Sequence, residues 1–176
     1  MRRLFPGRGD HPNRLAPEIR AAVPLGPGER ILAHGTDTAT GSVVVLTSWS
    51  LAAVDPTGGL LFRRPWSDAD GGGWAPRTKT VSVTWVDDSR PAQWSLASGG
   101  DRVAEVFRER VQASVALSAE VRVGDPVVAR AAVRKDLHTG ALFEQVVYGR
   151  GVRRDAPGVV AAVDAVLADL RDQTGL

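Results

Sequence analysis

The sequence has no cysteine, one methionine, one tyrosine and only two lysines among its 22 basic residues. The absence of cysteine excludes disulfide bonds, thiolate metal ligands and cysteine nucleophiles. The sequence also lacks an apolar run of about 18 residues, the length that a membrane-spanning helix requires. Packing of apolar side chains must therefore stabilise the fold, and arginine supplies almost all of the positive charge.

The remaining composition is that of a folded globular protein. Hydrophobic residues make up 43% of the 176 residues and charged residues 24%, which excludes a wholly disordered chain. This length suits one domain, or a small domain with an appendage, and it allows a substantial core. The formal net charge of +2 is weak evidence for nucleic-acid binding.

Residues 1–27 are expected to form an N-terminal leader with a short helix. Residues 6–10 read Pro-Gly-Arg-Gly-Asp, where a signal peptide would need an apolar run. We therefore expect a cytoplasmic protein. A helix is predicted over residues 13–23 because Asn13 can cap it and apolar residues follow at a spacing of four. These apolar residues are Leu15, Ile19 and Val23.

Residues 28–118 carry the signals of a compact, β-rich domain. Strands are predicted at 31–38, 42–48, 51–54, 60–62, 78–86 and 92–97. Residues 70–73 read Asp-Gly-Gly-Gly and predict a flexible loop between these strands. A helix is predicted over 101–116, with Asp101 as its N-cap and one apolar stripe along its length.

Residues 119–176 are predicted to form a β-β-α extension packed on that domain. Strands at 127–133 and 141–148 flank a basic loop at 134–140, and a helix begins after Asp155. An isolated helix of this length is marginal in water, so its apolar stripe must be covered. We expect it to dock on the protein's own sheet, and a symmetric dimer is the alternative. The stripe consists of Val159, Val160, Val163, Val166, Leu167 and Leu170.

Three short motifs resemble those of bacterial pleckstrin-homology-like (PH-like) domains of the GRAM-like type. They are residues 28–33 (Gly-Glu-Arg-Ile-Leu-Ala), 45–51 (Val-Leu-Thr-Ser-Trp-Ser-Leu) and 64–68 (Arg-Pro-Trp-Ser-Asp). The resemblance covers about residues 25–118. It implies an α+β fold: an antiparallel β-barrel or bent sheet, capped by the predicted helix at 101–116. The extension would add a β-hairpin and a C-terminal helix to this fold.

The same resemblance carries an expectation about lipids. PH-like domains that bind phosphoinositides usually have basic residues near the first hairpin. Here the hairpin at 36–41 contains one acidic and no basic residue, which departs from that pattern. We therefore expect binding to membrane surfaces to be weak, and a shared fold does not by itself fix a function.

The sequence contains no pattern that predicts a catalytic, cofactor-binding or metal-binding site. The three histidines are His11, His34 and His138, and none of them lies at metal-ligand spacing from another ligand. In a strand, His34 and Asp37 would point to opposite faces. His138 lies in the basic loop, where acid–base chemistry near a phosphate is an alternative to simple solvation. Serine-hydrolase and phosphate-loop motifs are absent.

Seven residues are candidates for binding an anion, and five tryptophans cluster in the middle of the chain. The tryptophans lie between residues 49 and 94, where they can stack on nucleic acid or fill a core and pair across strands. We favour the core interpretation for them, with Trp74 partly exposed and Trp85 facing Trp94 across one hairpin. The anion-binding candidates are Arg63, Arg64, Arg77, Lys79, Arg134, Lys135 and His138.

Together these features favour a non-catalytic, cytoplasmic binding or assembly module that recognises a protein partner or itself. Open sheet edges and apolar faces are what such a module would present. The first alternative is a module that binds an anionic surface, either lipid or nucleic acid, although nucleic acid is not the expected partner. The second alternative is an enzyme acting on a small anionic substrate. No cofactor and no metal are predicted.

Overall fold

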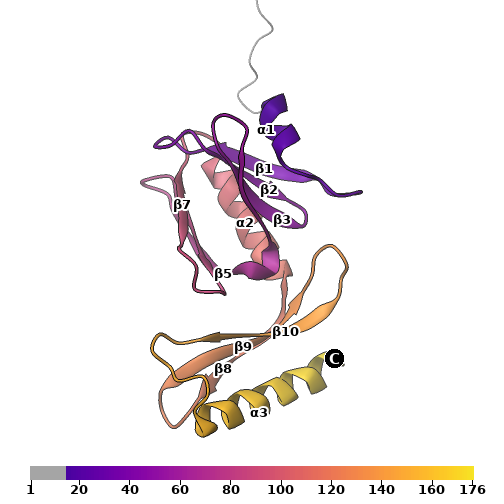
Figure 1. Cartoon of the computed structure of the whole chain (residues 1–176), viewed down its shortest axis with the longest axis vertical. Coiled ribbons are helices and arrows are strands. Elements are labelled where there is room, and N and C mark those ends of the chain that lie inside the picture. Colours follow the sequence, from indigo (N-terminus) through magenta and orange to yellow (C-terminus); the bar gives the residue numbers. More distant parts are fainter. Residues whose placement is uncertain (1–14) are drawn as a thin grey trace, which may run out of the picture.

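A computed structural model describes residues 15–176, and it is an α+β structure with three antiparallel sheets (Figure 1). The predicted N-cap Asn13 and His11 lie outside the described residues. The sheets have the orders β1-β2-β3-β4, β5-β6-β7 and β10-β9-β8. The elements are α1 (Pro17–Ala22), β1 (Ile31–Thr36), β2 (Val43–Thr47), β3 (Ser50–Val54), β4 (Leu60–Pro65), η1 (Trp66–Asp68), β5 (Ala69–Ala75), β6 (Thr80–Trp85), β7 (Ala92–Ser95), α2 (Gly100–Ala113), β8 (Val115–Arg122), β9 (Val127–Lys135), β10 (Leu142–Tyr148) and α3 (Pro157–Thr174).

The first sheet is buried on both faces at its two central strands. Every residue of β2 and β3 is buried, in keeping with the continuous apolar run at 43–46. One face packs against α2 through residues such as Val44 and Leu51. The other face carries Val45 and Val54, which pack against α1 through Ile19. The predicted leader helix therefore covers the outer face of this sheet.

The second sheet corrects the prediction of a flexible loop at residues 70–73. These residues belong to β5, which pairs with β6 in a register that sets Gly72 opposite Val83. Helix α2 lies between the first and second sheets (Figure 1). An isolated bridge between Asp37 and Leu96 links the two sheets at one corner. Within residues 15–176 the strands form separate sheets, so the barrel that was one expected form is not closed.

Three tryptophans fill the core between these two sheets. Trp66 is 1% exposed, and Trp85 and Trp94 are each 5% exposed, whereas Trp74 is only partly buried, as expected. The predicted pairing of Trp85 with Trp94 is wrong, because Trp94 lies opposite Val81 in the ladder. Phe62 of β4 contacts both rings instead, at centroid distances of 5.5 and 6.2 Å. The aromatic residues thus hold the two sheets together.

Residues 115–176 form a third sheet covered by α3, which we call the C-terminal unit; residues 17–113 are the N-terminal unit. Helix α2 ends at Ala113 rather than at 116, and β8 begins at Val115, so the predicted β-β-α extension has three strands. Helix α3 packs on β8 and β9, on the face turned away from the N-terminal unit, as predicted for docking on its own sheet (Figure 1). Val159, Val163, Leu167 and Leu170 of the stripe are buried, Val166 is partly buried, and Val160 is 42% exposed.

Oppositely charged residues join the two units. Arg130 of β9 pairs with Asp70 at the start of β5, and Arg154 pairs with Asp88 after β6 at 3.0 Å. Gln145 adds a hydrogen bond to the carbonyl oxygen of Ser67 at 3.0 Å. Two of the seven basic residues in 121–154 therefore pair with acidic residues of the N-terminal unit. Among residues 15–176, no helix combines the length and the apolar character needed to cross a membrane.

Candidate functional site

The seven predicted anion-binding residues do not converge on one site. Arg63 and Arg64 are neighbours on β4 but make separate contacts. Arg63 pairs with Glu29 at 2.7 Å, while Arg64 pairs with Asp87 at 3.0 Å and lies 4.6 Å above the Trp85 ring. Both guanidinium groups are therefore engaged within the N-terminal unit.

The other predicted cations are spread over distant parts of the chain. Arg77 and Lys79 are exposed in the turn between β5 and β6, and Lys135 is exposed at the end of β9. Arg134 is 3% exposed. It donates hydrogen bonds to the carbonyl oxygens of Trp66 and Ala69 at 3.0 and 3.1 Å and to the hydroxyl oxygen of Ser114 at 2.9 Å. Its side chain connects the two units instead of lining a surface.

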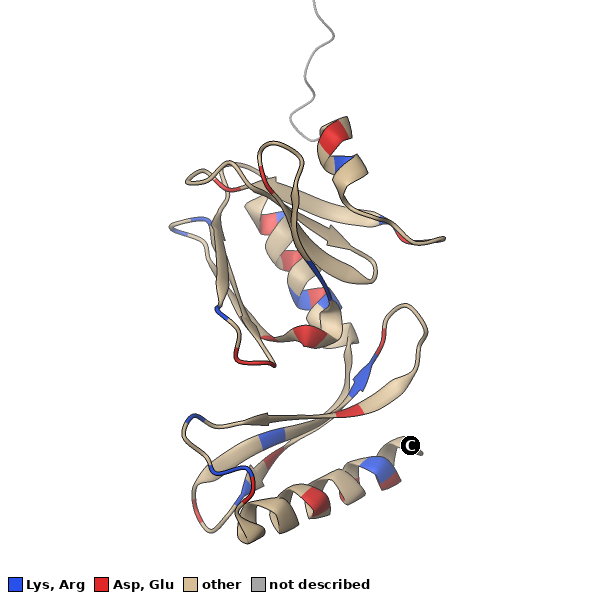
Figure 2. Cartoon of the chain, in the orientation of Figure 1, with Lys and Arg blue, Asp and Glu red and all other residues tan. Residues whose placement is uncertain are grey.

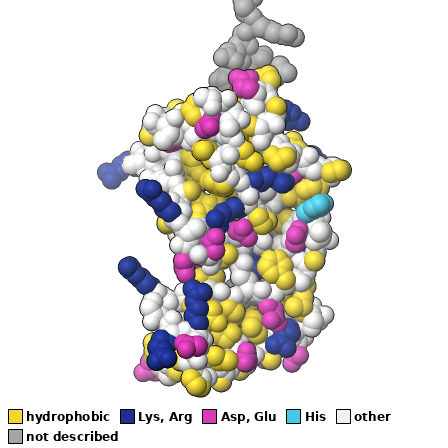
Figure 3. Space-filling model, in the orientation of Figure 1, with side chains coloured by type: hydrophobic (Ala, Val, Ile, Leu, Met, Phe, Trp, Pro, Cys, Tyr) yellow, Lys and Arg dark blue, Asp and Glu magenta, His cyan; other side chains and the backbone are white. Residues whose placement is uncertain are grey.

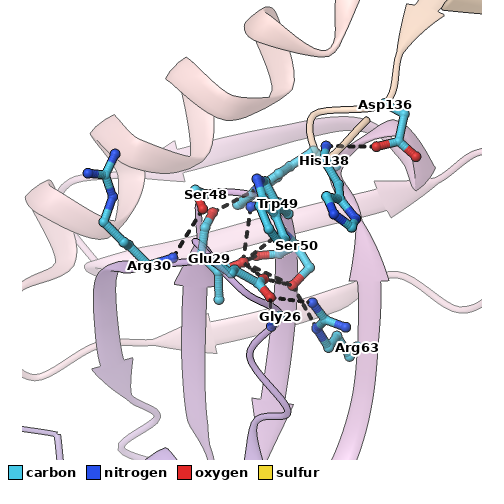
Figure 4. Close-up of polar contacts among 11 residues, drawn as sticks. Gly26, Glu29, Arg30, Ser48, Trp49, Ser50, Arg63, Asp136 and His138 are labelled. Atoms are coloured by element: carbon cyan, nitrogen blue, oxygen red, sulfur yellow. Dashed lines mark hydrogen bonds and ion pairs between the residues drawn. The ribbon is translucent and has the colours of Figure 1, made fainter. Parts of the chain in front are cut away.

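His138 contacts the N-terminal unit through an aromatic ring. The imidazole stacks on Trp49 with a centroid distance of 3.9 Å and an interplanar angle of 17° (Figure 4). Asp136 shapes this loop, because its carboxylate accepts hydrogen bonds from the backbone N–H groups of His138 and Thr139 at 2.7 and 3.0 Å. The basic loop between β9 and β10 therefore lies against the turn between β2 and β3.

A buried carboxylate lies next to this contact and connects two of the three sequence motifs, residues 28–33 and 45–51. Glu29 accepts hydrogen bonds from the hydroxyls of Thr47 and Ser50, from the Gly26 N–H and from Arg63 (Figure 4). Burial alone would raise the pKa of the Glu29 carboxyl, but these hydrogen bonds outweigh it and hold the pKa below its usual value. The Glu29 carboxylate thereby ties the segment before β1 to β2, β3 and β4.

A groove lies beside β5 in the N-terminal unit, and we call it the β5 groove. Among residues 15–176, strand β5 pairs with β6 alone, so its other edge has no strand partner in this part of the chain. Glycines 71, 72 and 73 leave this edge without side chains. A Cβ atom at Gly72 would overlap the Phe107 ring and lie 2.6 Å from the Ser82 carbonyl oxygen. Only glycine therefore lets β5 lie this close to α2.

The β5 groove has a volume of about 860 Å³, an apolar floor and a charged rim. Trp74, Val81 and Phe107 contribute to the floor, together with Ala104 and Val111 of α2. Acidic and basic residues alternate along the visible side of α2 in Figure 2, and charged side chains gather over the middle of the same face in Figure 3. The rim residues are Asp101, Glu105, Arg108 and Glu109, which together carry a formal charge of −2.

Sequence reasoning missed the β5 groove for a physical reason. A glycine run is ordinarily a loop signal, because glycine lowers strand stability. Here β6 supplies the backbone partners and Phe107 occupies the space that side chains would fill. The nearest available signal was Trp74, which was expected to be partly exposed beside the glycines.

Comparisons with known proteins do not indicate a function, so a proposal must be based on the geometry of the structure. No known family model matches the chain, and no curated protein matches it significantly. Residues 15–176 contain no group of three side chains placed to hold a metal ion. Asp37, which lies near His34 in sequence, accepts hydrogen bonds from the hydroxyl of Thr40 and from the N–H of Ser95, at 2.7 and 2.8 Å.

Proposed function

We propose that this chain is a non-catalytic, PH-like binding module that takes an extended segment of a protein partner into the β5 groove. The order of elements supports the PH-like part: four antiparallel strands, three more strands and then a helix that packs between the two sheets. The C-terminal unit would be an addition to that domain. The cytoplasmic location expected from the sequence stays a prediction.

The free edge of β5 is the observation that carries the proposed function. An edge strand presents unpaired N–H and C=O groups, and an incoming strand binds to them at a spacing of about 4.8 Å. Side chains on an edge strand often hinder this approach, but three consecutive glycines remove them here. Asp70 pairs with Arg130, whereas Gly71, Gly72 and Gly73 line the groove.

The walls of the groove indicate what kind of segment fits. Alternate side chains of a bound strand point to opposite sides, so one set would face the apolar floor at Val81 and Phe107. The rim lies on the same helix as Phe107, so longer side chains of this set would reach its three carboxylates and one guanidinium. We therefore propose a segment that carries both apolar and basic residues.

A short blocked peptide with alternating valine and arginine tests the proposal, and a valine–glutamate peptide of equal length is its counterpart. We expect the basic peptide to bind more tightly and to slow hydrogen exchange at the amide of Gly72 or Gly73, whichever of the two points away from β6. Reversing two rim charges, Glu105→Lys with Glu109→Lys, should weaken binding about tenfold, which corresponds to about 1.4 kcal/mol.

The matched control is Glu120→Lys, which reverses a charge on β8 outside the groove. This variant should bind the basic peptide as the natural chain does. Equal binding of the two peptides, or protection of amides away from β5, would contradict the proposal. If the natural chain forms concentration-dependent dimers and the rim variant does not, the partner in the β5 groove is a second copy of this chain.

A further inference from the structure

A second cavity lies between α1, β1 and α2, and we call it the β1 cavity. Its volume is about 520 Å³, within the range of roughly 300–1,000 Å³ that is usual for small-molecule sites. Three nitrogen-bearing side chains from three different elements line it: Arg20 of α1, His34 of β1 and Arg102 of α2. It shares no lining residue with the β5 groove, although α2 borders both.

The lining of the β1 cavity is positively charged. It contains no aspartate or glutamate, and both guanidinium groups keep their charge at any physiological pH. Arg20 makes no ion pair with any residue in the range 15–176, whereas Arg102 pairs with Glu105 at 2.6 Å. The His34 ring makes no hydrogen bond with a residue of that same range. Within the described part of the chain, one cation and one imidazole of the lining therefore have no charged or hydrogen-bonded partner.

Apolar side chains line the rest of the β1 cavity. Leu15, Ile31, Leu32 and Ala33 contribute, and Ala33 is buried while the other three are partly buried. Apolar walls beside cationic groups complement a ligand that has an anionic head and an apolar body. Guanidinium groups suit carboxylate and phosphate equally, because their parallel N–H donors match both geometries.

We propose that the β1 cavity binds a small amphipathic anion, in which a carboxylate or phosphate is attached to an apolar chain. Arg20 and Arg102 would bind the anionic head, and Ile31 with Leu15 would contact the apolar body. Residues 1–14 are not the expected occupant, because their four arginines and one aspartate give a positive charge that the positively charged lining would repel. The proposal is independent of the peptide proposed for the β5 groove.

Binding of dodecanoate and dodecyl phosphate, below their micellar concentrations, tests this proposal on the full chain. We expect both to shift the ring resonances of His34, with dodecanol and dodecyltrimethylammonium binding at least tenfold more weakly. The double variant Arg20→Gln with Arg102→Gln should weaken anion binding at least tenfold. Both arginines are exposed, so this variant should keep its melting temperature.

The matched control is Arg90→Gln, an exposed arginine in the connection between β6 and β7, and it should leave binding unchanged. Equal binding of dodecanol would show an apolar cavity without anion recognition and would overturn the proposal. So would equal weakening by Arg90→Gln, which would indicate unspecific attraction. Binding only to vesicles of phosphatidylcholine and phosphatidate, and not to the monomeric anions, would assign the arginines to a membrane surface instead.

Discussion

The two units of this protein differ in the composition of their cores and in the contacts of their charged residues. The N-terminal unit has a core of large aromatic residues between two sheets, and the β1 cavity and the β5 groove lie beside its edge strands. The C-terminal unit has a core of valine, alanine and leucine under one helix. Its charged residues Arg130, Arg134 and Arg154 all contact the N-terminal unit.

This difference separates candidate binding surfaces from structural support. In the N-terminal unit, α2 does not close the space beside β1 and β5, so strand edges and apolar walls remain accessible. In the C-terminal unit, α3 covers one face of the sheet and the N-terminal unit contacts the other. Three arginines of the C-terminal unit, Arg130, Arg134 and Arg154, therefore act as contacts between the units, and one of them, Arg134, is an anion-binding candidate in the sequence.

The largest effect is expected from emptying the core of either unit. Trp66→Ala removes a ring that is 1% exposed and whose N–H donates to the Thr47 carbonyl oxygen at 2.9 Å. We expect a loss of about 3–5 kcal/mol in the free energy of unfolding, and about 2–5 kcal/mol for Leu167→Ala under α3. Chemical denaturation followed by circular dichroism measures both values.

Leu61→Ala is the control for these core variants, because Leu61 is 57% exposed and its loss should change stability by no more than about 0.5 kcal/mol. If the units unfold together, each core variant shifts one common transition. Separate transitions, each shifted by only one of the two variants, would contradict the tight contact between the units that the structure describes.

A smaller effect is expected from Arg134→Met, which cuts the central contact between the units. The change leaves the carbonyl oxygens of Trp66 and Ala69 without this donor, and should cost about 1.5–3 kcal/mol. Burial raises the pKa of the Asp68 carboxyl, and Arg64 and Arg134 partly offset that effect. The variant should therefore raise the pKa of Asp68 further, which a nuclear magnetic resonance titration measures.

Arg130→Met is the matched control, on the same strand but with a side chain that is 46% exposed. Its exposed ion pair should contribute no more than about 1 kcal/mol. Equal losses of stability in the two variants would mean that burial of Arg134 does not distinguish it, and an unchanged pKa of Asp68 would contradict the electrostatic link.

The smallest effect, and one that depends on pH, is expected from Glu29→Gln. The folded chain lowers the pKa of this carboxyl, so its ionised form stabilises the fold above the ordinary value of 4.5. The variant should lose about 1–2 kcal/mol at neutral pH. As the pH falls through the lowered pKa, the natural chain loses this stabilisation, and the two stabilities should converge.

Glu120→Gln provides the comparison for that titration, because its pair with Arg122 is exposed on both sides. Its stability should follow the natural chain within about 0.5 kcal/mol at every pH. A difference between the natural chain and Glu29→Gln that stays constant from neutral to acidic pH would show that the hydrogen bonds, and not the charge, stabilise the cluster.

Local patterns predicted the elements whose partners are close in sequence. The alternation at 80–85 places Val81, Val83 and Trp85 in the core, and α3 buries four of the six residues of its stripe. These outcomes follow from periods of two and of about 3.6 residues, which the chain itself contains. Element ends were less well predicted: α2 stops at Ala113, since Val115 begins a strand that pairs with β9.

The positions of both cavities and the role of Arg134 depended on contacts between residues distant in sequence. Gly72 meets Phe107 across 35 positions, and Arg134 reaches Trp66 across 68. The sequence alone determined an α+β fold with an apolar core, few lysines and an amphipathic C-terminal helix. The tertiary structure decided which cations are buried, which strand edges stay free and which side chains share a cavity, because these depend on how sheets and helices pack and not on local periodicity.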